Sequence, residues 1–213
     1  MRNESKYIFV ITQNLSSRHQ THYICPMLTI NLQPFPEIKT QRFLLRKIQD
    51  SDINEIYFLR SDSEVMKYID KVPAKSLDDA RDFISRVNEL EKNNEGINWA
   101  ITIKGDLKLI GIISIWRIVH EHHRGEVGYV LHPDYWRQGI MQEAMTAVLD
   151  YGFRKLKLHS IEANVNPANT YSIKLLERNK FIREAYFKEN YFFENKFLDT
   201  AIYSRLTPVK NKL

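Results

Sequence analysis

Hydrophobic and polar residues follow clear secondary-structure periods from about residue 42 to the end of the chain. Apolar residues three and four positions apart mark helices, and short apolar or alternating runs mark strands. For example, a capping box at Ser76 and Asp79 precedes Ala80, Ile84 and Val87, which recur at helical spacing. The pattern predicts strands over residues 43–48, 98–103, 109–119, 126–131, 160–165, 181–191 and 197–206, and helices over residues 52–60, 76–92, 139–155 and 169–179.

The order of these elements describes the fold class. It reads β-α-α-β-β-β-α-β-α-β-β, so several strands follow one another directly. Such neighbours form hairpins, as the turn at Lys104-Gly105-Asp106 indicates. We therefore expect an α/β (α+β) domain with a mixed, mostly antiparallel central sheet of about seven strands flanked by helices.

The first 26 residues carry no sustained helical or strand period. They mix polar residues with scattered histidines, and Pro26 and the segment Pro34-Phe35-Pro36 interrupt any regular pattern before residue 40. We expect residues 1–26 to form a flexible N-terminal extension and residues 27–213 to form a single domain. The alternative is that residues 1–26 are an arm that docks on a neighbouring subunit.

Composition narrows the classes of protein that this pattern allows. Cys25 is the single cysteine, which excludes an intramolecular disulfide and a thiol metal cluster and favours the reducing cytoplasm. The longest apolar runs are too short to span a bilayer, so we expect no membrane association. The net charge is +5, and the basic residues are spread along the chain. This pattern indicates either an ordinary solvated surface or a mild preference for anionic partners. The three tryptophans lack interleaved basic residues, so there is no direct nucleic-acid motif, and we expect them in the core or a pocket wall.

A cluster of metal-ligand residue types occurs at His120-Glu121-His122-His123. It lies between two predicted strands and is followed by Arg124, which is typical of an exposed hairpin rather than of a metal site. We therefore expect no metal. The alternative role for this hairpin is to line the entrance for a substrate.

The stretch over residues 129–142 carries the strongest chemical signal. A strand ends at His132-Pro133, and a short turn leads through Arg137 and Gly139 into a helix. The first N–H groups of that helix have no partner within it, and the helix dipole adds partial positive charge there. Because glycine lets a ligand approach the main chain, this terminus is a candidate anion site; an ordinary strand–turn–helix connection is the alternative.

Residues 136–141, Trp-Arg-Gln-Gly-Ile-Met, resemble the Gln/Arg-x-x-Gly-x-Gly/Ala motif of the GNAT superfamily of acetyltransferases. In that family the motif holds the pyrophosphate of acetyl-CoA at a strand-to-helix junction. Trp136 replaces the first residue of the motif, and Met141 replaces its second small residue. Residues 166–181 resemble the family's Asn-x-x-Ser/Ala-x-x-x-Leu-x-x-x-Gly-Phe element, with Lys180 in place of the glycine.

The resemblance to the GNAT superfamily covers about residues 40–206. Within the superfamily, the sequence most resembles the ribosomal-protein-alanine N-acetyltransferase branch, whose final strand is similar to residues 197–204. It implies a GNAT fold whose sheet is splayed between the fourth and fifth strands, with acetyl-CoA or CoA in the gap. Asn169 would bond the pantetheine arm and is also a sound N-cap. The implied cofactor contacts are Tyr129, Val130, Leu131, Arg137, Gln138, Gly139, Ile140, Met141, Gln142 and Asn169.

The resemblance also implies catalytic groups on the strand before the phosphate motif. Glu126 is the candidate general base, and Gly128, on the same strand face, leaves room beside it for a substrate. The alternative is that Glu126 only attracts a cationic amine. Main-chain N–H groups around Tyr129 and Val130 would stabilise the oxyanion.

The residues that would assist the leaving thiolate differ in this sequence from those of many GNAT enzymes. Ser172 aligns with a serine that the ribosomal-protein branch places near the sulfur; the alternative is a first-turn helix residue that bonds main chain. Leu176 stands where many GNAT enzymes carry a tyrosine acid. Tyr191 stands where the branch can carry a further catalytic glutamate.

The resemblance implies a cytoplasmic, acetyl-CoA-dependent N-acetyltransferase that works by direct attack, without a covalent enzyme intermediate. The expected acceptor is a primary amine, namely a protein N-terminal α-amine such as that of a ribosomal protein. Two alternatives are a small-molecule amine acetyltransferase, acting on a polyamine or an aminoglycoside, and a CoA-binding regulatory module without catalysis. A monomer and a homodimer are both compatible with the sequence.

Overall fold

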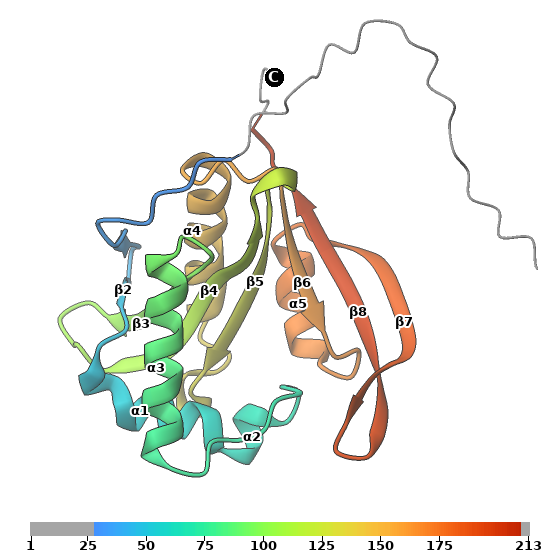
Figure 1. Cartoon of the computed structure of the whole chain (residues 1–213), viewed down its shortest axis with the longest axis horizontal. Helices are drawn as coiled ribbons and strands as arrows, with labels where there is room; N and C mark the ends of the chain where they lie inside the picture. Colours follow the sequence, from blue (N-terminus) through green and yellow to red (C-terminus); the bar gives the residue numbers. More distant parts are fainter. Residues whose placement is uncertain (1–27, 210–213) are drawn as a thin grey trace, which may run out of the picture.

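The computed structural model describes residues 28–209. In this range eight strands form one sheet in the order β1-β2-β3-β4-β5-β6-β8-β7 (Figure 1). The strands are β1 (Ile38–Lys39), β2 (Phe43–Lys47), β3 (Ile97–Ile103), β4 (Leu109–Val119), β5 (Arg124–Leu131), β6 (Ser160–Val165), β7 (Ile182–Phe193) and β8 (Lys196–Leu206). The α-helices are α1 (Ile53–Ser61), α2 (Ser63–Met66), α3 (Leu77–Lys92), α4 (Ile140–Arg154) and α5 (Thr170–Arg178), and short 3₁₀ turns are η1 (Asp50–Asp52), η2 (His120–His122) and η3 (Pro133–Tyr135).

The predicted fold class and element order are confirmed, and the differences lie in short elements. The two-residue strand β1 brings the sheet to eight strands rather than about seven. The helix α2 was not predicted; it begins directly after Asp62, whose carboxylate accepts hydrogen bonds from the N–H groups of Glu64 and Val65. The predicted capping box of α3 is present at Ser76 and Asp79.

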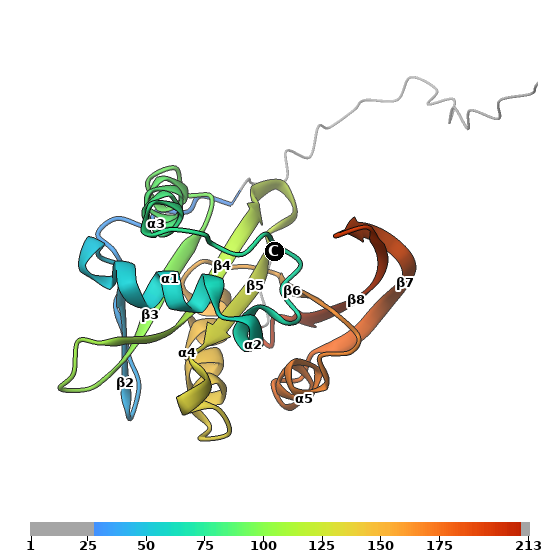
Figure 2. The same cartoon turned by 90° about the horizontal axis from the view of Figure 1, so that it is seen from below.

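The helices form a layer on each face of the sheet, with α1, α2 and α3 on one side and α4 and α5 on the other (Figure 2). Because successive strand residues point to opposite faces, β3 contributes to both layers. Trp99 and Ile101 pack in the larger hydrophobic cluster with α4, whereas Ala100 packs in the smaller cluster with α1 and α3. The central strands therefore read as nearly continuous apolar runs.

The strands β5 and β6 are the parallel neighbours in the described sheet, and they pair over only a short length. Their register runs from Arg124 opposite Ser160 to Glu126 opposite Glu162, and beyond these residues the strands diverge (Figure 1). The expected splay is therefore confirmed. Residues 127–131 keep β4 on one side and have no strand partner on the other, so main-chain groups on that edge are available to a ligand.

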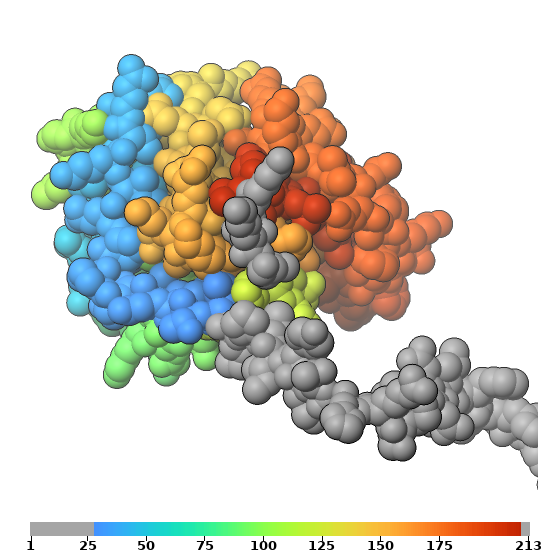
Figure 3. Space-filling view, turned by 90° about the horizontal axis from the view of Figure 1, so that it is seen from above, coloured from blue at the N-terminus to red at the C-terminus, as the bar shows by residue number. Residues whose placement is uncertain are grey.

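The first described residues are part of the core, although their sequence pattern did not indicate it. Leu28, Ile30 and Leu32 are buried in the larger hydrophobic cluster. Leu28 donates its N–H to the carbonyl of His120 at 3.3 Å, and its own carbonyl lies 2.8 Å from Nδ1 of the same residue. Figure 3 shows this segment in blue beside the yellow-green turn η2. The predicted extension over residues 1–26 lies outside the described residues.

The segment predicted as an exposed hairpin is the 3₁₀ turn η2, which ends at His123 with a φ of +48°. Glu121 and His122 are exposed, whereas His120 is bonded to Leu28. Within residues 28–209, no group of three or more His, Cys, Asp or Glu side chains is arranged to hold a metal ion. No helix in the same range is long and apolar enough to cross a membrane.

Shortening the chain should separate the contribution of residues 1–26 from that of the segment after them. A chain that begins at Met27 should melt close to the full-length protein, because unpatterned terminal residues are expected to add little to the core. A chain that begins at Gln33 also loses three buried side chains and should be clearly less stable, since one large-to-small change in a core costs about 2–5 kcal/mol. Thermal and urea unfolding measure both. A large loss already at Met27 would show that residues 1–26 pack on the domain or on a partner subunit.

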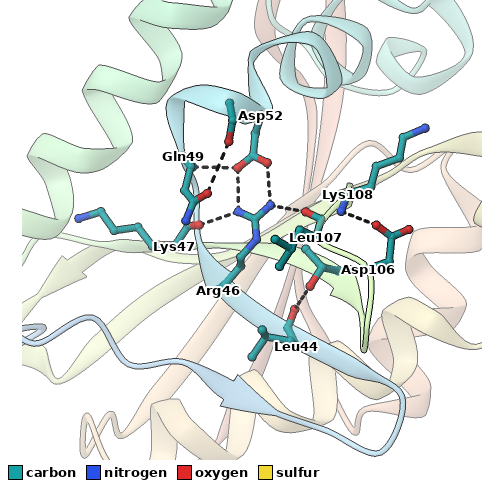
Figure 4. A network of polar contacts seen from close by, with 10 residues as sticks. Leu44, Arg46, Lys47, Gln49, Asp52, Asp106, Leu107 and Lys108 are labelled. Carbon is teal, nitrogen blue, oxygen red and sulfur yellow. Dashed lines mark hydrogen bonds and ion pairs between the residues drawn. The ribbon is translucent and has the colours of Figure 1, made fainter.

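A buried ion pair ties β2 to the turn that follows it and to a distant turn between β3 and β4 (Figure 4). The guanidinium of Arg46 donates to both carboxylate oxygens of Asp52 at 2.8 and 2.7 Å, and the two side chains are only 6% and 5% exposed. It also donates to the carbonyls of Lys47 and Leu107, and the N–H of Gln49 donates to the same carboxylate. This network holds the start of α1 and the turn between β3 and β4 against the end of β2.

Candidate active site

The turn between β5 and α4 has the features of an anion site. Gly139 is the N-cap of α4 and has a φ of +72°, which side chains other than glycine's rarely adopt. No side chain caps this 15-residue helix, so the N–H groups of its first turn, residues 140–142, lack a side-chain acceptor. A Cβ atom at Gly139 would find only Arg42 Nη2 within 4 Å, at 3.6 Å. The open space and the unpaired donors fit a diphosphate.

Two departures from the family motif leave this turn intact. Met141 packs its side chain in the larger hydrophobic cluster, so it does not cover the helix end. Trp136 donates from Nε1 to the carbonyl of Leu131 at 2.7 Å and so fixes the turn to the end of β5.

The side chain of Gln142 makes two hydrogen bonds with Asn179. The main-chain N–H of Gln142 is therefore the group that it can offer to an anion.

An arginine that the sequence analysis did not single out lies at the same turn. Arg42 donates from Nη1 to the carbonyl of Gln138 at 3.1 Å, and its main-chain N–H and Nε donate to Glu143 at 2.8 and 2.7 Å. Burial acts to raise the pKa of Glu143, but hydrogen bonds from Thr40 and Arg42 outweigh it and lower that pKa. Arg42 and Gln138 are 96 residues apart, so no local pattern could have indicated this contact.

On the other side of the gap, the start of α5 faces the turn between β5 and α4. Asn169 caps α5, because its side-chain oxygen accepts from the N–H of Ser172 at 3.1 Å, which confirms the predicted capping role. Arg137, whose φ is +61°, donates to the hydroxyl of Tyr171 at 3.2 Å. This pair joins the turn between β5 and α4 to the first turn of α5.

A second bond crosses the gap on the face of the sheet that α4 and α5 cover. The hydroxyls of Tyr129 and Ser172 lie 2.5 Å apart, and Tyr129 packs against the larger hydrophobic cluster. Burial raises the pKa of Tyr129 to about 12, with the Ser172 bond acting in the opposite direction, so the phenol is protonated at neutral pH. Leu176 is fully buried in the core, which leaves no polar group at the position of the usual tyrosine acid.

Glu126 lies on the opposite face, toward α1 and α3. Its neighbour Val127 points into the cluster on the α4 side, and successive strand residues point to opposite faces. Arg117 donates to Glu126 at 3.0 Å, and the glutamate side chain is 13% exposed. Arg117 has a φ of +48° at an irregularity in β4, and its guanidinium lies 4.2 Å from the ring centroid of Trp116. These contacts hold the carboxylate in one place.

Gly128 lies two residues after Glu126 on the same strand face, close to side chains of β4. A Cβ atom at Gly128 would lie 3.1 Å from Ser114 Oγ and 3.5 Å from Trp116 Nε1, so a larger side chain there would press on these two residues. Glu162, opposite Glu126 on β6, is paired with Arg124 at 2.9 Å. Each of the two carboxylates at the branching point of the sheet is therefore matched by an arginine.

Tyr191 lies where the hairpin of β7 and β8 meets the segment between α2 and α3. Its hydroxyl donates to the carbonyl of Asp70 at 3.2 Å. Burial raises the pKa of the Asp70 carboxyl, and Lys71 offsets part of this rise. Tyr191 therefore links two segments of the fold and carries no carboxylate into the site.

The predicted site residues thus gather at one gap but reach it from two faces of the sheet. The turn between β5 and α4 and Asn169 belong to segments on the two sides of the gap, and Tyr129, Val130 and Leu131 form its free strand edge. Glu126 and Ser172 lie on opposite faces and make no contact with each other. A carboxylate can accept a proton and a hydroxyl can donate a hydrogen bond, and acyl transfer makes use of both kinds of group.

Comparisons with known proteins relate the chain to a family of acetyltransferases. The family model described as the acetyltransferase (GNAT) domain matches residues 42–182. An uncharacterized N-acetyltransferase, p20 of Bacillus licheniformis, is 34% identical over 167 residues, which cover 78% of this chain and 94% of the relative. A crystal structure of a GNAT-family acetyltransferase from Bacillus anthracis aligns with a TM-score of 0.72 and 32% identity, over 82% of this chain and 100% of the other.

Relatives that are named for a particular acceptor differ from one another. The structure of ribosomal-protein-S5-alanine acetyltransferase from Vibrio fischeri has a TM-score of 0.72 and 26% identity, over 81% of this chain and 97% of the other. Spermidine N(1)-acetyltransferase of Escherichia coli is 23% identical over 137 residues, or 64% of this chain and 71% of the relative. A ribosomal L7/L12 α-N-protein acetyltransferase, solved in complex with coenzyme A, shares the fold, with a TM-score of 0.74 at 18% identity over 80% of this chain and 98% of the other.

Proposed function

Since this chain belongs to the GNAT family of acetyltransferases and is an N-acetyltransferase, we propose that it transfers the acetyl group of acetyl-CoA to the N-terminal α-amine of a protein, such as a ribosomal protein. The observation that carries this proposal is the arrangement of Glu126 and Ser172, which reach the gap between β5 and β6 from opposite faces of the sheet. One face would receive the amine, and the other would receive the leaving sulfur.

The two sides of the gap would bind different parts of acetyl-CoA. The N–H groups of residues 139–142, with Arg42 and Arg137, would bind the pyrophosphate. The amide of Asn169 and the free edge of β5 over residues 129–131 would bind the pantetheine arm. When bound, the thioester supplies a carbonyl carbon that a neutral amine can attack.

Three groups of this chain would then assist the transfer. Glu126 would accept the proton that the amine loses as its nitrogen bonds to the carbonyl carbon. Main-chain N–H groups near Tyr129 and Val130 would stabilise the charge that develops on the carbonyl oxygen. Ser172 would donate a hydrogen bond to the sulfur as the carbon–sulfur bond breaks and its electron pair passes to sulfur. The proton that the sulfur gains balances the proton that the amine loses.

Charge on the acceptor face favours an α-amine over a polyamine. Glu126 and Glu162 are each paired with an arginine, so these two carboxylates add no surplus negative charge that would attract a multiply charged cation. An α-amine has a pKa of ~7.7–8.0, so roughly a tenth of it is neutral at pH 7, whereas an alkyl amine with a pKa of ~10.4 is neutral in roughly one molecule per thousand or fewer. The relative that is named for ribosomal protein S5 alanine supports the same class of acceptor.

A turnover screen that follows thiol release tests the proposed acceptor. The acceptors are peptides that begin with alanine, serine or methionine, together with spermidine and an aminoglycoside. We expect the peptide α-amines to react fastest. Faster turnover of spermidine would replace the proposed acceptor, and CoA binding without acetylation of any amine would favour a regulatory module.

Gly139→Asp should weaken CoA binding about tenfold or more, as measured by calorimetry. The new carboxylate would stand at the helix N-terminus, against the diphosphate of the ligand. Gly139→Asn is the matched control, because asparagine has nearly the same shape, tolerates a positive φ and carries no charge. Equal affinity of the two variants for CoA would place the diphosphate elsewhere.

A further inference from the structure

Tyr129 and Ser172 are joined by a 2.5 Å hydrogen bond that crosses from β5 to the first turn of α5. The two residues are 43 positions apart, and β5 and β6 have already parted where the bond crosses. The main chain of Ser172 is held as well, because its N–H donates to the capping residue Asn169. The hydroxyl of Ser172 is therefore fixed at one place in the wall of the gap.

Either hydroxyl of this pair is able to donate, and we assign the Tyr129 phenol as the donor. Burial raises the pKa of its phenol to about 12, so the phenol carries its proton at neutral pH. Ser172 Oγ is the hydrogen-bond partner of this partly buried phenol among the described residues, so the phenol proton has an acceptor there. A hydroxyl that accepts one bond keeps its own proton for a third atom.

We propose that Tyr129 is a positioning residue for acetyl transfer: its hydroxyl donates to Ser172 Oγ and so directs the Ser172 proton toward the sulfur of bound CoA. This inference rests on the proposed function, because it needs the thiol end of CoA in the gap between β5 and β6. Leu176 on α5 stands where many GNAT enzymes carry a tyrosine acid, and it is buried and has no hydroxyl. In this chain Tyr129 of β5 would supply a tyrosine hydroxyl instead, and it would act through Ser172.

Tyr129 and Ser172 act by hydrogen bonding and keep their protons. As the amine nitrogen bonds to carbon and the carbon–sulfur bond breaks, the electron pair moves to sulfur, where the Ser172 hydroxyl stabilises it. A thiol has an ordinary pKa of ~8.5, so its thiolate does not deprotonate a phenol whose pKa is about 12. The sulfur takes its proton from solvent, which balances the proton that passes from the amine to Glu126.

The pKa of the CoA thiol in the complex reports on this hydrogen bond without any turnover. It is measured from the ultraviolet absorbance of the thiolate as pH rises, after subtraction of the same titration with desulfo-CoA. In the wild type the thiol pKa should lie below that of free CoA, because a hydrogen bond to the charged form favours that form. Tyr129→Phe and Ser172→Ala should each weaken the ionisation by roughly two- to tenfold, the effect of one hydrogen bond.

Tyr151→Phe is the matched control. Tyr151 of α4 is also a tyrosine whose pKa is raised by burial, and it packs edge-on against Trp99, so the variant removes the same oxygen without touching Ser172. Tyr129→Phe should lower kcat by about three- to tenfold and change the KM for acetyl-CoA by less than about twofold. Adding Tyr129→Phe to Ser172→Ala should cause no further loss, because the two residues act as one unit.

An equal thiol pKa in the wild type and in Tyr129→Phe would overturn this inference, and so would fully independent effects of the two substitutions on kcat. Equal losses of kcat and of thermal stability in Tyr129→Phe and Tyr151→Phe would reduce Tyr129 to a packing residue. A wild type that acetylates no amine would contradict the proposed function, yet the thiol titration would still test Tyr129. A wild type that does not bind CoA would overturn both.

Discussion

Glu126→Gln is expected to lower kcat by about 10²–10⁴-fold while the affinity for CoA stays nearly unchanged. This range is typical of a lost general base, and glutamine keeps the volume of glutamate but cannot accept the amine's proton. The substitution lies on the face of the sheet opposite to Ser172, so the wall that would receive the sulfur is preserved. Steady-state kinetics with a reactive peptide and calorimetry with CoA measure the two quantities.

The pH dependence and a matched variant sharpen this expectation. The loss should shrink as pH rises toward the pKa of the acceptor, ~7.7–8.0 for an α-amine, because amine that is already neutral needs less help. Glu162→Gln removes a carboxylate from the neighbouring strand, on the same face and also paired with an arginine, and should leave kcat within about twofold. Full activity of Glu126→Gln at neutral pH would assign proton transfer to water or to another carboxylate.

Asp52→Ala should reduce the free energy of unfolding by about 3–5 kcal/mol, the cost of leaving a buried charge without its partner. The partner is Arg46, whose side chain is 6% exposed and whose Nε already lacks a hydrogen bond. The substitution also removes the acceptor for the N–H of Gln49 at the start of η1. Such a loss is a large fraction of the ~5–15 kcal/mol that stabilises a typical domain.

Urea unfolding of Asp52→Ala and of a surface control measures this effect. Asp150→Ala breaks the pair with Arg154, whose two side chains are 63% and 62% exposed, and should change stability by less than about 1 kcal/mol. A cost for Asp52→Ala no greater than that for Asp150→Ala would show that the buried network contributes little to the fold.

Much of the fold could be predicted from the sequence because it depends on residues that are close together in the chain. The apolar spacing behind Ser76 predicts α3, and its capping box is present in the structure. The glycine at 139 predicts the start of α4, because a positive φ at a helix N-cap suits glycine. The short strand β1 and the helix α2 were missed, because two to four residues are too few to show a period.

Lys180 departs from the family motif, and the structure shows how the helix end accommodates a lysine in place of glycine. This lysine adopts a φ of +65°. The N–H of Lys180 donates to the carbonyl of Glu177, and that of Phe181 donates to the carbonyl of Leu176, which is the hydrogen-bond pattern of a Schellman helix end. Phe181 is buried in the core, so packing holds the lysine in a conformation that glycine would adopt more easily.

The sequence by itself determined the element order, the position of the turn before α4 and the family, because each of these depends on short, contiguous patterns of residues. Only the tertiary structure placed Arg42 at Gln138, joined Tyr129 to Ser172 and set Arg117 on Glu126. The first two contacts join residues 96 and 43 positions apart that the twisted and splayed sheet brings together, and the third crosses from β4 to β5 at an irregularity of their pairing. The carboxylate of Glu126 lies on one face of the sheet, and the hydroxyls of Tyr129 and Ser172 lie on the other. Both faces meet the gap because β5 and β6 diverge there, and no local pattern encodes that divergence.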